Sequence, residues 1–453
     1  MKNSSSVNRK KTAVVGGGWA GAAAAVTLAQ NNHEVHWLES SRLLGGRARK
    51  VEVRGKNLDN GQHIMLGAYT SCLKLLKALN LNNEQCFLRL PLQMIYPEGS
   101  GMQFIAPHLP APLHLAFALL RAQGLSREDK MALARFSTTA RWMDWQLNID
   151  CSVTELLQRY QQTENLIKLM WNPLCIAALN TPPDRASARV FLAVLRDSLG
   201  AKRNASDMLI PKLDLSALLP EAAARFVEAK GGQIRLGAMV QGLEKVESNR
   251  WQISCPSLEM GAMIYDSVVL ATPAETSKRM LKDLADDQAI VDTSPAEFPQ
   301  DFEYEAITTC YLQYASSTSL KRPFFALVDD PDQAHWGQFV FDRGQLHQDQ
   351  SGLLAVVISA AANAIAIDKD LLVKQIAKQL ADVLHMPELS QPLWHQVISE
   401  KRATFSCTPD LQRPLNRTSH TGLVLAGDYT ACDYPATLES AVRSGIAAAQ
   451  FLL

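Results

Sequence analysis

Six residues near the N-terminus have the types and the spacing needed to bind a phosphorylated cofactor. They are Gly16-Gly17-Gly18-Trp19-Ala20-Gly21, a run of the form G-x-G-x-x-G. The first glycine of such a run permits a tight turn, the second lets a pyrophosphate approach the backbone, and the third lets a helix pack closely on a strand. Glu39 follows Gly21 by 18 residues, near the spacing at which an acid binds ribose hydroxyl groups. The predicted dinucleotide ligands are Gly16, Gly18, Trp19, Ala20, Gly21 and Glu39.

The elements that must position this run are predicted on both sides of it. The apolar, β-branched stretch 12–15 is typical of a buried parallel strand. An alanine-rich helix is expected over 22–30, and a second strand over 34–38 ends at Glu39. The N-terminus of the helix would offer free N–H groups and a positive dipole end to phosphates. An acid at the end of the second strand favours an unphosphorylated ribose, as in FAD or NAD rather than NADP.

Two further segments favour FAD over NAD through a resemblance to known proteins. Gly45-Gly46-Arg47 resembles the glycine–arginine segment that follows the ribose acid in the amine oxidase and phytoene desaturase flavoproteins. Ala426-Gly427-Asp428, between a predicted strand over 423–425 and a predicted helix over 436–452, is similar to the segment that closes those chains. The resemblance implies that Arg47 pairs with a phosphate or the flavin, and that Asp428 binds the ribityl chain or a phosphate. It also implies that the backbone of Val240 contacts the adenine. The additional FAD ligands expected on this basis are Gly46, Arg47, Val240, Gly427 and Asp428.

Several segments narrow the resemblance to one subfamily. Leu58-Asp59-Asn60-Gly61-Gln62-His63 and the stretch 435–445 are similar to segments of the squalene-associated FAD-dependent desaturases, also called hydroxysqualene dehydroxylases. That family converts hydroxysqualene to squalene on the route to hopanoids. The resemblance therefore implies a reductive dehydroxylation of an isoprenoid alcohol, in which reduced flavin supplies hydride from N5 to the allylic carbon and water is lost. The protein would contribute a dry pocket, orientation and an acid.

The proton donor is not determined by any motif. His63 is the candidate, because its loop is expected beside the flavin and an imidazole titrates near neutral pH; the alternative is a histidine that only anchors the loop. Asn60, Gln62 and Phe341 are candidates for lining the substrate site. Asp342 and Arg343 predict an ion pair or a cap, and Glu439 predicts support for the first turn of the last helix.

An apolar run between Gly99 and Leu120 is long enough to cross a bilayer, but it contains Pro107, Pro110 and Pro112. Prolines break a lone spanning helix, so we expect a peripheral membrane footprint here, with Phe104, Ile105, Leu109 and Phe117 as contacts. A squalene-sized substrate is scarcely soluble in water and would enter from the membrane. Three tryptophans could line the path of such a substrate or belong to the core: Trp142, Trp145 and Trp171.

The composition limits the other classes of function. Lys plus Arg and Asp plus Glu both number 45, so the balance lacks the basic excess that a nucleic-acid partner requires. The eight cysteines include no C-x-x-C pair, so neither a zinc site nor another metal site is expected. The first eleven residues lack the apolar segment of a signal peptide, which predicts a cytoplasmic protein attached to the inner face of the membrane.

Four rival functions stay open. They are another FAD-dependent isoprenoid desaturase of the phytoene or squalene type, an amine oxidase that uses oxygen as acceptor, an NAD-dependent dehydrogenase, and a flavoprotein escort without enzymatic activity. A second dinucleotide motif is absent from the sequence. The electron donor would therefore be a nicotinamide cofactor that binds without a motif, or a separate reductase.

The expected architecture is an α/β fold with a discontinuous Rossmann-type FAD-binding domain and a mixed α+β substrate domain. Residues 8–72, 208–273 and 400–453 are assigned to the FAD-binding domain, and residues 73–207 and 274–399 to the substrate-binding domain.

Overall fold

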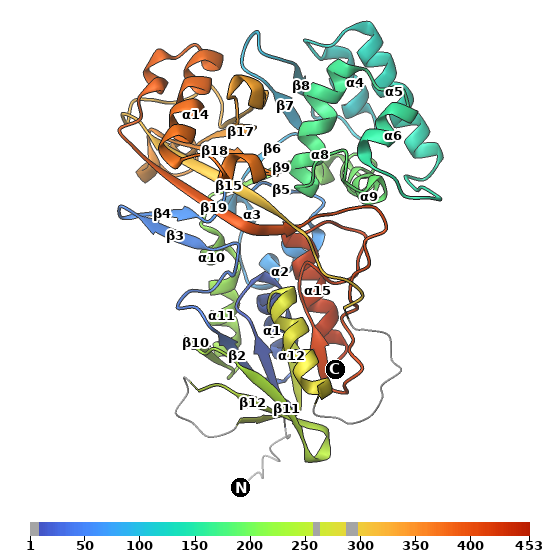
Figure 1. Cartoon of the computed structure of the whole chain (residues 1–453), viewed down its shortest axis with the longest axis vertical. Coiled ribbons are helices and arrows are strands. Elements are labelled where there is room, and N and C mark those ends of the chain that lie inside the picture. The colour runs from blue at the N-terminus through green and yellow to red at the C-terminus, as the bar shows by residue number, and fades with distance from the viewer. Residues whose placement is uncertain (1–8, 257–262, 287–297) are drawn as a thin grey trace.

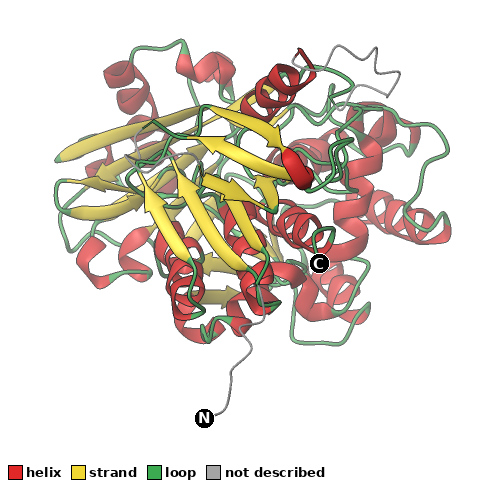
Figure 2. Cartoon of the chain, turned by 90° about the horizontal axis from the view of Figure 1, so that it is seen from below, coloured by secondary structure: helices red, strands yellow, loops and turns green. Residues whose placement is uncertain are grey.

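The chain forms two lobes, each built around its own sheet (Figure 1). The computed structural model describes residues 9–256, 263–286 and 298–453. One lobe, which we call the parallel-sheet lobe, lies at the end that carries both termini. The other, the antiparallel-sheet lobe, lies at the opposite end of the long axis. Seen from below, the strands occupy the centre and left of the molecule and helices lie around them (Figure 2).

The parallel sheet has the strand order of a Rossmann-type domain. Its five strands run β10-β2-β1-β14-β20, and every neighbouring pair is parallel. Parallel strands covered on both faces are apolar throughout, and β14 and β20 are buried at every position. The bounds are β1 (Lys11–Val15), β2 (Glu34–Glu39), β10 (Gln233–Leu236), β14 (Ser267–Leu270) and β20 (Leu423–Leu425). The predicted strands at 12–15, 34–38 and 423–425 are therefore confirmed.

Two helices that are far apart in sequence pack closely on this sheet. They are α1 (Trp19–Gln30) and α15 (Leu438–Gln450). A Cβ added at Gly445 would lie 2.1 Å from the Ala20 carbonyl oxygen, so the two backbones approach each other directly. Helix α15 begins two residues later than the predicted 436, because Thr437 caps it and forms a capping box with Ser440. Helices α2 (Thr70–Ala78), α10 (Leu215–Leu218) and α11 (Pro220–Ala229) complete this layer.

The other elements of the parallel-sheet lobe lie near its lower end (Figure 1). Strands β11, β12 and β13 form a small antiparallel sheet, and α12 lies beside β11. The bounds are β11 (Gly242–Val246), β12 (Arg250–Ser254), β13 (Met263–Tyr265) and α12 (Ala274–Asp286).

The antiparallel-sheet lobe is built on a second five-stranded sheet, in the order β16-β17-β18-β15-β19. Successive side chains of β15 alternate between two clusters: Cys310 and Leu312 belong to a cluster with α14, and Tyr311 belongs to the core that the two lobes share. The bounds are β15 (Tyr304–Gln313), β16 (Phe324–Ala326), β17 (Phe339–Asp342), β18 (Leu353–Ile358), β19 (Trp394–Phe405), α13 (Ala362–Ile365) and α14 (Lys369–Leu384).

Helices form the rest of this lobe, at the upper right of Figure 1. Their bounds are α4 (Leu113–Arg121), α5 (Arg127–Trp142), α6 (Val153–Arg159), α7 (Glu164–Leu166), α8 (Asn172–Leu179) and α9 (Ala188–Ser198). Short strands connect the lobes: β3 (Lys50–Val53) pairs with β4 (Lys56–Asp59), β7 (Gln93–Ile95) with β8 (Gln103–Ile105), and β9 (Met208–Pro211) with both β5 (Met65–Leu66) and β6 (Phe87–Leu90). Helix α3 (Asn83–Cys86) precedes β6.

The α/β class and the Rossmann-type domain agree with the prediction, but the lobe boundaries differ from the predicted domain limits in three places. Strand β19 remains in the antiparallel sheet as far as Phe405, beyond the predicted limit at 400. Helix α2 extends past residue 72 and packs in the same core as α1 and α15. Helix α12, placed after the limit at 273, lies beside β11. Two of these elements, β19 and α2, continue across a predicted limit, and α12 begins directly after one, because the motifs alone could not locate where the chain passes between the lobes.

Candidate functional site

The glycine turn after β1 is shaped by close contacts that exclude side chains. Gly16 has a φ of +113°, and an added Cβ would lie 2.3 Å from the Ala271 carbonyl oxygen. A Cβ at Gly21 would lie 2.0 Å from the Gly16 carbonyl oxygen, so α1 packs directly on the turn. These two glycines therefore have the turn and packing roles predicted from the sequence.

Gly18 and Gly46 lie close together, because Gly45 donates its N–H to the Gly17 carbonyl oxygen at 2.8 Å. A Cβ added at Gly46 would lie 3.1 Å from the Gly18 Cα, which is tighter than an ordinary contact. A Cβ added at Gly18 would meet a single neighbour within 4 Å, the Gly46 Cα at 3.9 Å, and Gly18 itself is partly exposed. Helix α1 also begins here without a side-chain cap, which leaves its first N–H groups available to an anion. The residues present thus fit a bound pyrophosphate.

Trp19 and Ala20 begin α1 and are both buried. The Trp19 indole Nε1 is buried and has no hydrogen-bond partner among the described residues. Both residues lie at the turn, as predicted, although Trp19 contributes an unpaired donor rather than a contact that the structure shows.

The carboxylate of Glu39 is held by the same turn. It accepts hydrogen bonds from the Gly17 N–H, from the Ser41 N–H at 2.6 Å and from the Ser40 hydroxyl at 3.1 Å. Its backbone oxygen accepts from the Ala238 N–H at 2.8 Å, and Val240 is buried close by in the chain. The structure therefore brings the predicted ribose acid and the predicted adenine segment to one end of the parallel sheet.

Arg47 and Asp428, predicted as separate cofactor ligands, form an ion pair. Arg47 Nη2 lies 2.6 Å from Asp428 Oδ1, and Arg47 Nη1 donates to the Ala403 carbonyl at 2.8 Å. The neighbouring Asp428 carboxylate raises the pKa of Arg47 against the lowering effect of burial. The preceding residue, Gly427, donates its N–H to the Ser444 hydroxyl of α15 at 2.9 Å. The two ends of the chain thus meet beside the glycine turns.

The loop after β4 lies directly on this region. Asn60 donates to the Arg47 carbonyl oxygen at 3.0 Å and to Glu400 at 3.3 Å. Gln62 is buried, and both ends of its amide have partners: Nε2 donates to the His63 carbonyl at 3.2 Å, and Oε1 accepts from Arg343 at 2.7 Å. The loop therefore connects the Arg47 segment with the antiparallel-sheet lobe.

His63 is half-buried and its protonation can be assigned from its contact. Its Nδ1 lies 2.7 Å from the Gly61 carbonyl oxygen, which can only accept, so Nδ1 carries a proton. Burial lowers the pKa of the imidazole, although the bond to Gly61 raises it in part. A neutral ring with Nδ1 protonated leaves Nε2 as an acceptor. This arrangement suits a residue that orients a hydroxyl group better than one that donates a proton.

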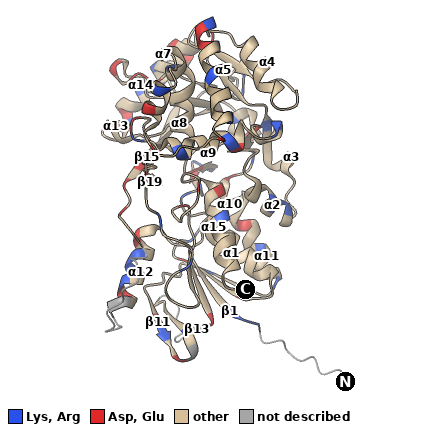
Figure 3. Ribbon diagram, turned by 90° about the vertical axis from the view of Figure 1, so that its right-hand side faces the viewer, with Lys and Arg blue, Asp and Glu red and all other residues tan. Residues whose placement is uncertain are grey.

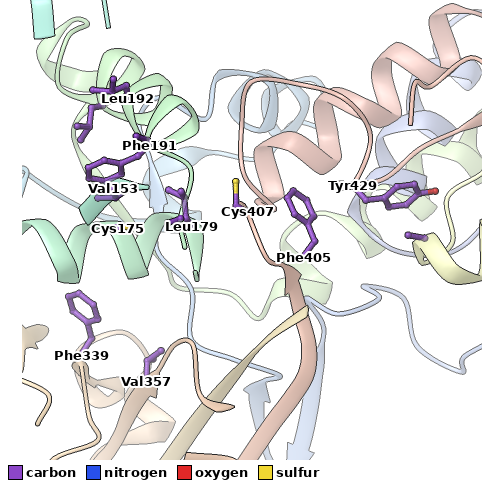
Figure 4. Close-up of a cluster of buried hydrophobic side chains, with 14 of the residues drawn as sticks. Val153, Cys175, Leu179, Phe191, Leu192, Phe339, Val357, Phe405, Cys407 and Tyr429 are labelled. Carbon is purple, nitrogen blue, oxygen red and sulfur yellow. The ribbon is translucent and has the colours of Figure 1, made fainter. Parts of the chain in front are cut away.

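The side of the antiparallel sheet that belongs to the shared core is apolar. Phe341 is buried and stacks on Phe324 with 5.6 Å between ring centroids. Figure 4 shows Phe339 and Val357 of the sheet facing Cys175 and Leu179 of α8, with Phe405 to one side. The side chains between the sheet and α8 therefore form a packed apolar core.

Asp342 and Arg343 were predicted to form an ion pair or a cap, and the structure shows the cap: Asp342 accepts the Gly344 N–H of the following turn. Arg343 does form an ion pair, but with Asp59 at 3.9 Å and not with its neighbour. No sequence motif indicated Asp59 as the partner of Arg343. Burial raises the pKa of its carboxyl to about 6.

Glu439 lies in the first turn of α15, as predicted, but it also caps another helix. Its carboxylate accepts from the N–H groups of Ser71 and Cys72 at the start of α2, at 3.0 and 2.9 Å. Arg443 donates to the same carboxylate at 2.7 Å. The side chain therefore joins α2 to α15.

Some of the three tryptophans and of the predicted membrane contacts are buried, and others are exposed. Trp145 and Trp171 are buried in the core, whereas Trp142 is 86% exposed. Phe104 is buried and is wrong as a surface contact, while Ile105 and Phe117 are exposed and Leu109 is partly exposed. Within the described ranges, no helix is long and apolar enough to cross a membrane. A group of three or more potential metal ligands is likewise absent from those ranges.

The parallel sheet, the glycine turn and the acid that ends β2 define a dinucleotide-binding oxidoreductase fold. Comparison with known proteins identifies the family: the model described as flavin containing amine oxidoreductase matches residues 19–453, and the chain belongs to that family. It is therefore a flavoprotein and an oxidoreductase.

The chain is similar in sequence to enzymes that act on isoprenoids and similar in fold to an amine oxidase. The chain is 27% identical to hydroxysqualene dehydroxylase of Rhodopseudomonas palustris, over 98% of each chain. It is 24% identical to 15-cis-phytoene desaturase of Capsicum annuum, over 94% of this chain and 75% of the relative. Among solved structures, cyclohexylamine oxidase from Brevibacterium oxydans has a TM-score of 0.69 at 14% identity, over 98% of each chain, which shows a shared fold.

Proposed function

We propose that this flavoprotein uses FAD and removes the hydroxyl group of hydroxysqualene to give squalene. The full-length similarity to hydroxysqualene dehydroxylase, over 98% of both chains, carries the proposal. The apolar side chains that the antiparallel sheet and α8 direct toward each other are compatible with a hydrocarbon substrate. Glu39, with its carboxylate beside the Gly17 turn, supports a dinucleotide with a free ribose, which favours FAD over FMN.

The residues of the site divide the work of this reaction. Gly18, Gly46 and the start of α1 would hold the pyrophosphate, and Glu39 the ribose. When bound and fully reduced, the flavin would supply a hydride and a proton, so that the hydride replaces the hydroxyl group and the hydroxyl group leaves as water. His63 Nε2 would accept a hydrogen bond from the substrate hydroxyl and so fix its position. Apolar side chains around the bound substrate would exclude solvent from the reacting carbon.

An anaerobic experiment tests this function. The purified enzyme is photoreduced, hydroxysqualene is added, and the flavin spectrum is followed while the lipid is extracted. We expect flavin reoxidation together with squalene, and deuterium placed on flavin N5 should appear at the former carbinol carbon. A flavin that stays reduced, with no squalene formed, would contradict the proposal. Bleaching of the oxidised enzyme by squalene, a carotenoid precursor or an amine would then assign a desaturase or an amine oxidase.

We also propose that the protein takes its substrate from an anionic membrane surface on the cytoplasmic side. Seven of the sixteen exposed large hydrophobic side chains of the described residues lie between 105 and 149. Helices α4 and α5, which carry most of them, lie at the end of the molecule opposite the N-terminus (Figures 1 and 3). Exposed arginines accompany them, which suits anionic lipid headgroups. The apolar members are Ile105, Leu113, Phe117, Leu120, Met131, Trp142 and Ile149, and the arginines are Arg121, Arg127, Arg135 and Arg141.

Vesicle sedimentation with matched variants tests this surface. Leu120 is 70% exposed on α4, and Leu393, outside this surface in the sequence, is 73% exposed. We expect Leu120→Glu and Trp142→Glu to reduce binding to anionic vesicles, and Leu393→Glu to leave it unchanged. Equal binding by all three variants would exclude α4 and α5 as the contact. Binding that is equally strong to zwitterionic vesicles would exclude the role of the arginines.

A further inference from the structure

A buried ion pair connects the two lobes beneath the His63 loop. Asp59 ends β4 and Arg343 follows β17, and their side chains are 2% and 1% exposed. The Arg343 Nη1 and Asp59 Oδ2 atoms are 3.9 Å apart. Removing two charges from water is costly, and apolar residues of similar volume often stabilise a core as well. Stability alone therefore does not explain why a charged pair is buried at this position.

The polar groups around this pair are engaged across the lobe boundary. Arg343 donates from Nε to Gln350 at 2.8 Å and from Nη1 to Gln62 at 2.7 Å. Asp59 Oδ1 accepts from the Leu215 N–H at 2.8 Å, at the start of α10. The Tyr311 hydroxyl donates to the Asp59 carbonyl oxygen at 2.9 Å. Asp59 is thus held by one lobe through the bond from Leu215 to its carboxylate, and by the other through the bond from Tyr311 to its carbonyl oxygen.

The contacts of Arg343 continue to the loop that carries His63. Gln62 accepts from Arg343 through Oε1 and donates through Nε2 to the His63 carbonyl at 3.2 Å. On its other side the loop binds the Arg47 segment through Asn60. The guanidinium has a fixed planar geometry, so the direction of its bond to Gln62 is fixed by its bonds to its other partners.

We propose that Arg343 and Asp59 are positioning residues, which fix the Gln62–His63 segment relative to the cofactor from the substrate side. The predicted changes in kcat rest on the proposed function, because they are measured with hydroxysqualene as the substrate. Neither residue has a contact that would make it a reacting group. Their effect is exerted through Gln62 and the loop backbone, so they should influence the rate of the chemical step more than the affinity for the substrate.

The charges around Asp59 give the proposal a pH dependence. Three groups change the pKa of its carboxyl: Arg343, the Leu215 N–H and Asp214. Arg343 also has a lowering effect on the pKa values of two neighbouring groups, His347 and Tyr311. Burial raises the pKa of Asp59 to about 6, against the lowering effects of Arg343 and Leu215. Burial and Arg343 lower the pKa of His347 to about 4, so it stays neutral in this range. Protonation of Asp59 below about pH 6 would remove the counter-charge of Arg343 and loosen the loop.

The test uses Arg343→Lys and Asp59→Asn in the flavin-loaded enzyme, with Arg185→Lys as the matched control. Arg185 also forms an ion pair in the antiparallel-sheet lobe, with Glu305 at 2.7 Å, but its side chain is 45% exposed. We expect Arg343→Lys to lower kcat about ten- to hundredfold with little change in KM, because a lysine cannot reproduce the planar fork. The acid limb of the kcat profile near pH 6 should be absent in Asp59→Asn. Equal kcat values in Arg343→Lys and Arg185→Lys would overturn the proposal, as would an unchanged acid limb.

A second measurement separates this proposal from the proposed function. The visible circular dichroism of bound flavin reports the surroundings of its ring without any substrate. We expect Arg343→Lys to change this spectrum at unchanged flavin content, at temperatures below the onset of its unfolding, because a buried arginine that loses its partners also lowers the Tm. Arg185→Lys should leave the spectrum as in the wild type. A wild-type enzyme that fails to form squalene would refute the proposed function alone. An Arg343→Lys spectrum identical to the wild-type spectrum would refute the positioning role.

Discussion

Replacing Glu39 with alanine should weaken flavin binding by a predictable amount. The carboxylate is charged and buried, and hydrogen bonds to charged groups contribute about 1.5–3 kcal/mol each. Loss of the ribose contact therefore corresponds to about a ten- to hundredfold increase in the Kd for FAD. Glutamine should restore only part of this affinity. Both carboxylate oxygens already accept backbone N–H groups, from Gly17 and Ser41, so the NH₂ of glutamine would face one of these donors.

The assay is a titration of apoprotein with FAD, followed by quenching of flavin fluorescence. Glu34→Ala is the matched control, because Glu34 lies at the other end of β2 and its carboxylate lies 3.1 Å from the nearby His36 Nε2. The Tm of each apoprotein is measured separately, since Glu39→Ala also deprives the Gly17 N–H of its acceptor. A Kd for Glu39→Ala within about twofold of the Glu34→Ala value would refute the assignment of Glu39 to the ribose.

Three further outcomes follow from the contacts. Gly18→Ala should leave the Tm of the apoprotein unchanged but weaken FAD binding at least about tenfold. Gly21→Ala should instead lower the Tm of the apoprotein, because its Cβ would lie 2.0 Å from a backbone oxygen. Equal effects of the two substitutions on the Tm would contradict this distinction. Thiol titration of the native protein should detect one fast-reacting cysteine, Cys432, and eight after unfolding, because the other seven are buried; Cys432→Ser should remove the fast phase. Glu439→Ala should destabilise the protein by about 1–3 kcal/mol in thermal or denaturant unfolding, because two buried N–H groups at the start of α2 lose their acceptor, and an unchanged stability would mean that water replaces it.

The nucleotide-binding turn was predictable because its requirements are local. A positive φ at Gly16 and a close approach at Gly21 each demand glycine, so the residue types reveal the geometry. The strands at 12–15 and 267–270 are short, β-branched and buried on both faces, and their composition is typical of a parallel sheet. Even the start of the last helix differed from the prediction by only two residues, through the cap at Thr437.

The contacts between the lobes could not be predicted in this way. Asp59 and Arg343 are separated by 284 positions, and a charged residue that will be buried looks in the sequence like one that faces solvent. Arg343 follows Asp342 directly, which suggested a pair, but neighbouring residues at the end of a strand point in opposite directions. Their partners depend on how β17 lies against β4. The predicted limit at residue 72 likewise divided helix α2, because the packing of this helix on α15 depends on a carboxylate, Glu439, that is 368 positions away from Ser71.

The position of these contacts has a consequence for how the site works. The local glycine and acid contacts lie in the parallel-sheet lobe, so they can form whether or not the other lobe is correctly placed. The His63 loop differs, because Arg47 and Leu215 hold it from one side and Arg343 and Tyr311 from the other. A change in the packing of the lobes would therefore move His63 while leaving Glu39 and Gly18 in place. Affinity for the cofactor and the rate of the chemical step should thus respond separately to substitution, the first in one lobe and the second at the junction of both.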